Sequence, residues 1–164
     1  MFAGFERAFS RTVKALCTVW LALIFVMFLL NVFVRFVPIY NFTQTDDWIQ
    51  FCLIWMLFAA SAELVRTRRH FVVDVLVTQV KSSAAAGGLR ALALAIEAIT
   101  YGVVFYYGIV WVMRSGAYFQ SIPWLQVRYA YLALPVSAFF MLVFALRDLI
   151  GLWRHGGTLP AVTP

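Results

Sequence analysis

The residues of this 164-residue chain that could take part in chemistry are few and scattered. Only His70 and Asp74 have a spacing that suggests a joint role, because residues four apart on a helix are neighbours. Such a pair could shuttle protons or bind a ligand, or it could orient a loop and fix its contact with a partner. One histidine and one aspartate are too few ligands for a metal site. The two cysteines, Cys17 and Cys52, lie in apolar stretches without metal or redox spacing.

Three further polar residues, Asn31, Glu63 and Glu97, lie within long apolar stretches. Charged groups inside a membrane are costly and are candidates for function. A single carboxylate such as Glu97, with no obvious partner, would make a poor sodium site. We therefore favour a hydrogen bond to another helix, or an extension toward the interface, as the explanation for all three residues. No nucleophile motif, phosphate-binding loop or carboxylate cluster is visible, so we predict no catalytic residue, no bound cofactor and no metal.

The composition of the chain indicates the environment in which these residues lie. Hydrophobic residues make up 64% of the chain and charged residues 12%, and the mean hydropathy is +0.88. Soluble domains have about 45–50% apolar and about 25% charged residues. A soluble fold of this size could not hide so much apolar surface. An ordinary soluble enzyme, a disordered chain and a disulfide-stapled secreted module are therefore excluded.

Four apolar stretches are each long enough to cross a membrane, at about residues 15–36, 48–65, 91–113 and 129–150. The first exceeds the apolar region of a signal peptide, about 7–15 residues, and no small-residue cleavage site follows it. We therefore expect a retained helix there. Pro135 is expected to kink the fourth stretch. The fold class is an all-α integral membrane protein with four transmembrane helices in one domain, residues 1–155, followed by a disordered tail, residues 156–164.

The basic residues predict which side of the membrane each end faces. Ten lie in the N-terminal segment, the loop between the second and third spans and the C-terminal end, against three in the other two loops. We therefore expect both termini in the cytoplasm. Asp46, Asp47 and Trp124 then lie on the outer side. The net charge of +6 is explained as an orientation signal, and no binding of nucleic acid is expected.

The loop between the second and third spans contains the most distinctive segment of the chain. On a helical wheel, four polar side chains share one narrow face and four aliphatic ones gather opposite: His70, Asp74, Thr78 and Lys81, against Val73, Leu76, Val77 and Val80. This pattern predicts a short amphipathic helix lying in the cytoplasmic interface. Arg66, Arg68 and Arg69 are expected to face anionic lipid headgroups, each contributing about 1 kcal/mol.

These features resemble the small membrane subunit of tripartite ATP-independent periplasmic (TRAP) transporters, the DctQ-like proteins, over nearly the whole chain. The most specific element is the basic pair Arg68-Arg69 followed by His70 and Asp74 after the second span. The remaining matches are Asp47 at the start of that span, Trp55 within it, the run Gln120-Ser121-Ile122-Pro123-Trp124, Tyr129, and Leu134-Pro135. The chain departs from many relatives near Ala59–Ala60, where they have a glycine, and near Asp47, where they have a glutamate.

The resemblance implies a small permease subunit in a bacterial or archaeal cytoplasmic membrane. It implies a large membrane subunit that holds the substrate and sodium sites, and an extracytoplasmic binding protein that delivers a C4-dicarboxylate, a sialic acid or a related carboxylate. In this hypothesis Arg68, Arg69, His70 and Asp74 form a structural or assembly motif. Docking of the binding protein is a possible role of three outer residues, Asp46, Asp47 and Trp124.

Two alternatives come from other classes of protein. A four-helix anchor of a redox complex would need axial histidines inside the spans to bind haem, whereas His70 and His155 lie outside them. A small autonomous channel would conduct ions without any partner.

Overall fold

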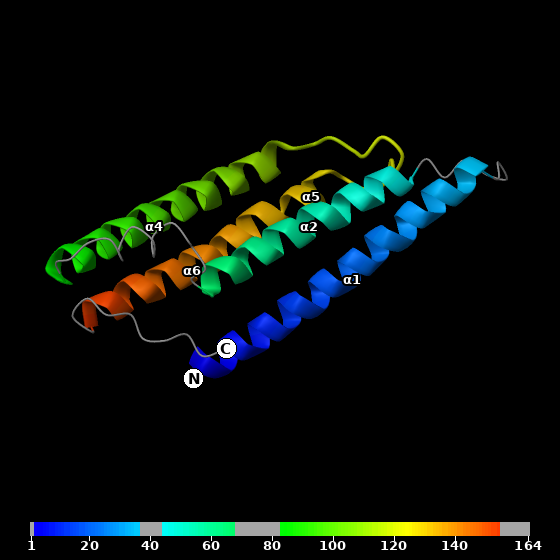
Figure 1. Ribbon diagram of the computed structural model, residues 1–164. Coiled ribbons are helices and arrows are strands. Elements are labelled where there is room, and N and C mark those ends of the chain that lie inside the picture. The colour runs from blue at the N-terminus through cyan, green and yellow to red at the C-terminus, as the bar shows by residue number, and fades with distance from the viewer. Residues whose placement is uncertain (1, 37–43, 68–82, 155–164) are drawn as a thin grey trace. The chain divides into compact units, whose positions relative to one another are not determined.

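The chain folds into α-helices, as the computed structural model in Figure 1 shows. It describes residues 2–36, 44–67 and 83–154. The helices are α1 (Phe2–Phe36), α2 (Thr45–Arg66), α4 (Ser83–Arg114), α5 (Arg128–Tyr131) and α6 (Ala133–Arg154). Within those ranges there is no β-strand, and an isolated bridge joins Tyr118 and Gln126.

Among the described residues, four helical segments are long and apolar enough to cross a membrane: Glu6–Phe36, Thr45–Arg66, Gly87–Arg114 and Arg128–Trp153. Each contains one of the four expected spans. The prediction of an all-α membrane protein with four transmembrane helices is therefore confirmed. The expected interfacial helix and the 156–164 tail lie outside the described residues.

Helix α1 is longer than the apolar stretch that predicts it. It has 35 residues and begins at Phe2 rather than near residue 15, so it extends over about 52 Å at 1.5 Å per residue. The hydrocarbon core is about 30 Å thick. The added turns carry charged residues, yet Ser10 and Val13 are each only 7% exposed. The helix therefore continues past the apolar stretch because these turns have contacts of their own.

The fourth span is interrupted near its beginning. Helices α5 and α6 are separated at Leu132, whose backbone stays in the right-handed helical region. Pro135 is the third residue of α6. A proline has no N–H to donate to the carbonyl four residues earlier, and its ring crowds that carbonyl. The carbonyl belongs to Tyr131, where α5 ends, so the proline explains the position of the break.

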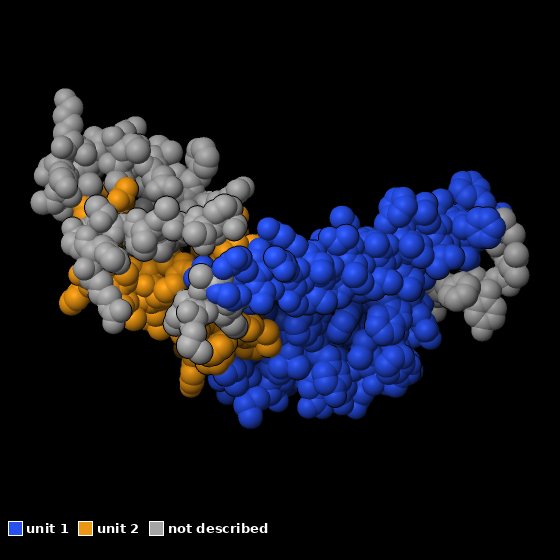
Figure 2. Space-filling view, turned by 90° about the horizontal axis from the view of Figure 1, so that it is seen from below, with its two compact units in different colours: residues 1–60, 108–134 blue, residues 61–107, 135–164 orange. Residues whose placement is uncertain are grey.

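The chain divides into two compact units, which Figure 2 distinguishes by colour. Unit 1 comprises residues 1–60 and 108–134, and unit 2 comprises residues 61–107 and 135–164. A core cluster of unit 1 consists of three buried residues with partly buried neighbours around them: Phe119, Ile122 and Ala130, with Trp48, Phe51, Ile54, Leu125 and Val127.

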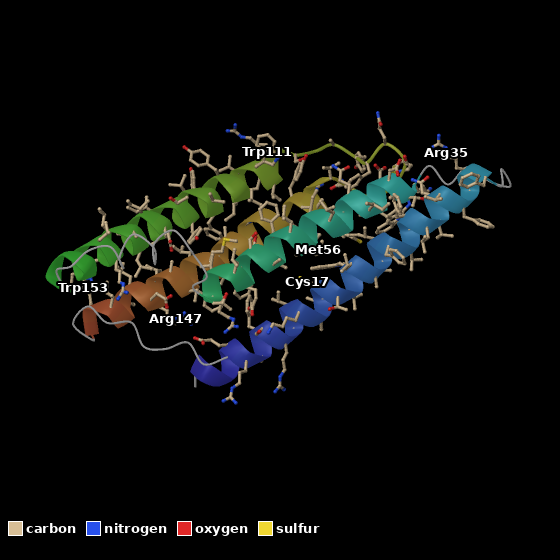
Figure 3. All side chains as sticks on the ribbon, in the orientation of Figure 1. Cys17, Arg35, Met56, Trp111, Arg147 and Trp153 are labelled. Atoms are coloured by element: carbon tan, nitrogen blue, oxygen red, sulfur yellow. The ribbon has the colours of Figure 1, made fainter. Side chains whose placement is uncertain are left out.

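Within unit 1, α1 and α2 pack antiparallel. The Sγ atom of Cys17 lies 3.9 Å from the carbonyl oxygen of Met56 (Figure 3). Farther along α1, Asn31 donates a hydrogen bond of 2.8 Å to Asp46, which lies in the first turn of α2. Because later residues of α1 meet earlier residues of α2, the two helices run in opposite directions.

In unit 2, α6 buries one face along its length. The buried side chains recur at intervals typical of a helix face packed on a core: Ser137, Ala138, Phe144, Ala145, Asp148 and Leu152. Phe139 of α6 contacts Phe105 of α4, with ring centroids 5.9 Å apart. This contact joins α4 and α6 within the unit.

Candidate functional site

One end of unit 1 brings together the polar residues that the sequence singles out. It contains the last turns of α1, the first turn of α2 and the segment 115–127, which we call the α4–α5 loop. Asp47 is in the first turn of α2, and its Oδ2 atom accepts a 2.8 Å hydrogen bond from the backbone N–H of Ser121. A carboxylate is favoured at a helix N-terminus, and its charge strengthens the hydrogen bond. Asp47 therefore fixes the α4–α5 loop to α2.

The α4–α5 loop also forms hydrogen bonds within itself. The N–H of Phe119 donates to the Leu125 carbonyl at 3.1 Å, and the N–H of Leu125 donates to the Ile122 carbonyl at 3.0 Å. The second bond closes a turn with Pro123 at its second position, where the fixed φ of proline is favoured. The Ile122 side chain is fully buried. The loop is therefore a packed element with a defined shape.

Asp46 holds the neighbouring helix. Its Oδ1 atom accepts the 2.8 Å hydrogen bond from the Asn31 amide. Asn31, expected as a polar residue inside a span, thus has a partner at the first turn of α2. Asp46 and Asp47 together connect α2 to α1 and to the α4–α5 loop.

Trp124 is exposed at this end of unit 1. Its side chain is 67% exposed, and its ring lies 6.1 Å from that of Trp48. The structure therefore gathers the three residues expected at an outer docking surface, but in different states. Asp46 and Asp47 have hydrogen-bond partners within the chain, whereas Trp124 presents most of its ring to the surroundings.

Trp55 joins three elements of unit 1, a role that the sequence does not reveal. Its ring centroid lies 6.0 Å from that of Trp20 on α1 and 6.4 Å from that of Phe51 on α2. Its Nε1–H donates a 3.1 Å hydrogen bond to the Tyr129 carbonyl in α5. The indole therefore ties α2 to the backbone of α5.

Unit 2 contains buried charged groups in α2. Both carboxylate oxygens of Glu63 accept hydrogen bonds from the Arg66 guanidinium, each at 2.8 Å. The side chains are 14% and 5% exposed, respectively. Glu63 is therefore not an isolated carboxylate. Arg66, expected to face lipid headgroups, is buried beside it, and that expectation is wrong.

A second ion pair in unit 2 lies in α6. The Arg147 Nε–H donates to the Asp148 carboxylate at 2.7 Å, and the Asp148 side chain is 4% exposed. The Arg147 guanidinium also lies 5.4 Å from the centre of the Phe144 ring. A cation over an aromatic face is attracted by the ring quadrupole. These two contacts offset part of the cost of burying Arg147, which is labelled in Figure 3.

The remaining candidates are placed as follows. Glu97 lies on α4 in unit 2, is partly buried and takes part in an interaction within the chain. Arg68, Arg69, His70 and Asp74 lie outside the described residues, so their role stays a prediction. In the part of the chain that the structure describes, no group of three or more His, Cys, Asp or Glu side chains could hold a metal ion.

Replacement of Asp47 by alanine is expected to lower the free energy of unfolding by about 2 kcal/mol. The reason is the loss of a hydrogen bond to a charged group, which contributes about 1.5–3 kcal/mol. Amide hydrogen exchange at Ser121 should also become faster. Unfolding is measured by titrating SDS into the chain in mild detergent and following the helical circular dichroism.

Asp46→Ala is the matched control, because Asp46 is exposed and bonds only to a side chain of α1 among the contacts given above. We expect it to cost about 0.5–1 kcal/mol, because water screens this exposed hydrogen bond, and to leave exchange at Ser121 unchanged. Equal effects of the two variants would contradict the assignment of Asp47 to the loop.

Four long apolar helices with internally paired polar groups define a multi-pass α-helical membrane protein. A family model described as the DctQ component of tripartite ATP-independent periplasmic transporters matches residues 24–155. The chain belongs to this family, the small membrane subunits of TRAP transporters. The match covers the end of unit 1 described above, including residues 24–36 of α1. Neither the curated proteins nor the solved structures compared with the chain gave a match.

Proposed function

We propose that the chain is the small permease subunit of a TRAP transporter and acts as a scaffold for the large membrane subunit. The system takes up an organic acid, a C4-dicarboxylate, a sialic acid or a related carboxylate, from an extracytoplasmic binding protein. Uptake is coupled to sodium, and the substrate and sodium sites lie in the large subunit. This chain itself carries no cofactor and performs no enzymatic step.

The scaffold role is supported by the pairing of polar groups in the membrane-capable helices with other groups of the same chain. Asn31 bonds to Asp46, and Glu63 to Arg66, within the chain. A transport pathway needs polar groups that face a cavity and can exchange ligands. Groups engaged in contacts within and between helices stabilise the fold instead.

We further propose that both termini face the cytoplasm in a bacterial or archaeal inner membrane. The distribution of basic residues supports this orientation. The α4–α5 loop then faces outward, where the exposed Trp124 can contact the binding protein while Asp46 and Asp47 position the surface around it. Arg68, Arg69, His70 and Asp74 face the cytoplasm beside lipid headgroups and contribute to assembly with the large subunit.

Co-purification tests this proposal. We expect a tagged form of the chain, expressed with the large subunit and the binding protein of the same organism, to recover the large subunit in mild detergent. Reconstituted vesicles should take up succinate, a sialic acid or a keto acid under a sodium gradient only when all three proteins are present. Isolation of this chain as a stable protein that transports these acids without a larger partner would refute the proposal.

A further inference from the structure

One face of α1 changes from basic to apolar along the helix. Exposed residues recur on it at alternating intervals of four and three, which keep side chains on one side of a helix. We call this face the α1 stripe, and it consists of Arg7, Arg11, Lys14, Thr18, Leu21 and Phe25. The Thr18 hydroxyl donates a 2.9 Å hydrogen bond to the Lys14 carbonyl of the same helix. The stripe therefore presents cationic side chains before Thr18 and apolar side chains after it.

The packed side of α1 lies elsewhere on the helix. Ser10 and Val13 are buried, and Cys17 and Trp20 contact α2. These four residues lie on average about a quarter of a turn around the helix from the α1 stripe. Glu6, the acidic residue of α1, lies toward the packed side as well. The stripe therefore faces away from the fold and contains no carboxylate.

Arg11 and Lys14 have no counter-ion among the described residues. Neither side chain forms a hydrogen bond or an ion pair with any of them. Together with Arg7, these cations extend over about 10 Å of the helix. Like charges three or four residues apart on a helix repel one another. An anion bound beside them would relieve this repulsion.

The length of α1 places these cations at the level of lipid headgroups. Its uncharged part, residues 15–34, extends over about 30 Å, which matches the thickness of the hydrocarbon core. Lys14 then lies at the edge of that core, and Arg11 lies about 5 Å outside it. Headgroups occupy the next 5–8 Å or so on each side of the membrane. Long basic side chains direct their charges into this region, where the lipid phosphates lie.

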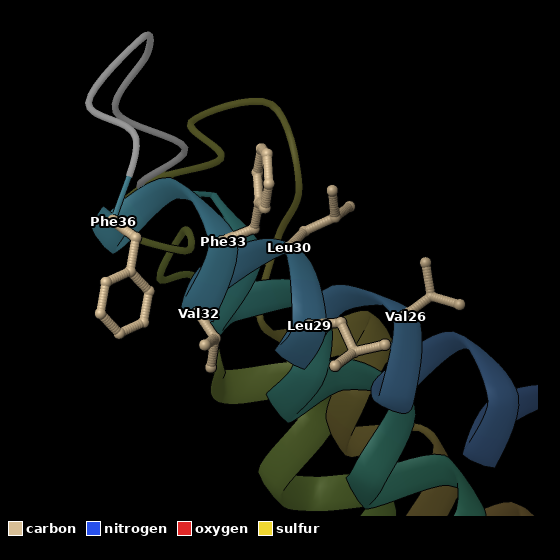
Figure 4. Close-up of a pocket in the computed structure, with 6 residues that line it drawn as sticks. All are labelled: Val26, Leu29, Leu30, Val32, Phe33 and Phe36. Carbon is tan, nitrogen blue, oxygen red and sulfur yellow. The ribbon is translucent and has the colours of Figure 1, made fainter.

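The apolar groove on the later turns of α1 lies too far from these cations to hold the same lipid. Figure 4 shows this groove, which is lined by Val26, Leu29, Leu30, Val32, Phe33 and Phe36. Val26 is about 18 Å along the helix from Lys14, whereas half of the hydrocarbon core is about 15 Å thick. Leu21 is 58% exposed and only about 10 Å from Lys14. An acyl chain that begins near Lys14 therefore follows the α1 stripe along Leu21.

We propose that the α1 stripe binds one anionic phospholipid, whose phosphate contacts Arg11 and Lys14 and whose acyl chain lies along Leu21 and Phe25. The inference goes beyond the proposed function and requires only that α1 crosses a membrane. Charge complementarity selects an anion, and the apolar continuation of the same face selects a lipid over a water-soluble anion. A zwitterionic lipid has no net charge to offset the cations. A second copy of the chain would bring the same cations together, which disfavours a homodimer through this face.

Photocrosslinking from the apolar part of the stripe tests the preference for an anionic headgroup. The photoreactive residue p-benzoylphenylalanine replaces Leu21 in the full chain, in vesicles of equal parts phosphatidylglycerol and phosphatidylcholine, and mass spectrometry identifies the crosslinked lipid. A basic residue near the membrane surface favours an anionic lipid about fivefold, so the two cations should enrich phosphatidylglycerol about 25-fold at position 21. Phe33, which is 60% exposed in the groove, is the control position. We expect about fivefold enrichment or less there, because only one cation, Arg35, is near it in the sequence.

The cations are tested with the double variant Arg11→Gln/Lys14→Gln. We expect the enrichment of phosphatidylglycerol at position 21 to fall by about 25-fold, which leaves the two lipids crosslinked about equally. Arg35→Gln/Arg114→Gln is the matched control, because it removes the same charge from exposed residues in the last turns of α1 and α4. We expect the control to leave the enrichment at position 21 unchanged. Circular dichroism checks that both variants stay helical.

Three results would overturn this inference. Equal enrichment at positions 21 and 33 of the otherwise unchanged chain would mean that the α1 stripe has no preference of its own. Loss of the enrichment in excess inorganic phosphate would indicate a site for a free anion instead of a lipid. Crosslinks from position 21 to a second copy of the chain, or to a co-expressed large subunit, would assign the stripe to a protein contact. Each result leaves the scaffold role intact, because that role is tested by recovery of the large subunit.

Discussion

Trp55→Ala is expected to lower the free energy of unfolding by about 2–3 kcal/mol and to reduce recovery of the folded chain from membranes. The substitution removes the contacts with Trp20 and Phe51 together with the hydrogen bond to the Tyr129 carbonyl. Truncation of a fully buried aromatic residue costs about 3–5 kcal/mol. The loss is smaller here because Trp55 is only partly buried. SDS titration in mild detergent, followed by circular dichroism, gives the free energy.

Trp55→Phe separates the ring contacts from the hydrogen bond. It keeps an aromatic ring on α2 and removes the indole N–H, so we expect a loss of only about 0.6 kcal/mol, the average for an interhelical hydrogen bond in a membrane. Trp111→Ala is the matched control for tryptophan truncation. Trp111 is 62% exposed and contacts Tyr131 edge to face, so we expect a loss of about 1 kcal/mol. Equal losses from Trp55→Ala and Trp111→Ala would contradict a central role of Trp55.

The four membrane spans could be predicted because hydropathy and the placement of charges are local properties of the sequence. The start of α1 could not be predicted in this way. Hydropathy marks where a helix meets hydrocarbon, whereas the helix itself ends where its backbone loses favourable contacts. Ser10 and Val13 are buried in turns that hydropathy alone would exclude. The limits of the lipid-facing stretch and of the helix are therefore different quantities.

The candidate site could be predicted only in part, for a related reason. The sequence identifies Asp47 as a polar residue at a helix start, but its partner Ser121 is 74 residues away. Nothing in the local pattern selects that amide among many. Trp55 and the Tyr129 carbonyl are also 74 residues apart. Contacts of this kind depend on how the helices and the α4–α5 loop pack, which residue spacing along one helix does not determine.

Glu63 and Arg66 are an exception, because the signal for their pairing was local. They are three residues apart on one helix, a spacing at which opposite charges meet. Arg66 begins a basic segment that continues with Arg68 and Arg69, and such a segment predicts a position at the lipid surface. In the structure, however, Arg66 is only 4% exposed and is buried in the fold. A charged residue at the edge of a basic segment can therefore belong to the fold rather than to the membrane surface.

Breaking the Glu63–Arg66 pair is expected to lower the free energy of unfolding by about 3 kcal/mol. Removal of one partner from a buried ion pair costs about 3–5 kcal/mol because the other charge stays in a poorly solvated place. The 14% exposure of the Glu63 side chain puts the expected loss for Glu63→Gln at the lower end of that range. Arg66→Gln should cost a similar amount. Exposed Arg11, replaced by glutamine, is the control and should change stability by about 0.5 kcal/mol or less.

The double variant Glu63→Gln/Arg66→Gln shows whether the two charges act on each other. If they do, the double variant loses less stability than the two single variants combined, with a coupling energy of about 1–3 kcal/mol. Additive losses would mean that each charge is held by other groups. The pair occupies the last turn of α2, immediately before Arg68, Arg69 and His70 in the sequence. In a coupled pair, either single substitution should therefore also reduce assembly with the large subunit, and the double variant should restore part of it.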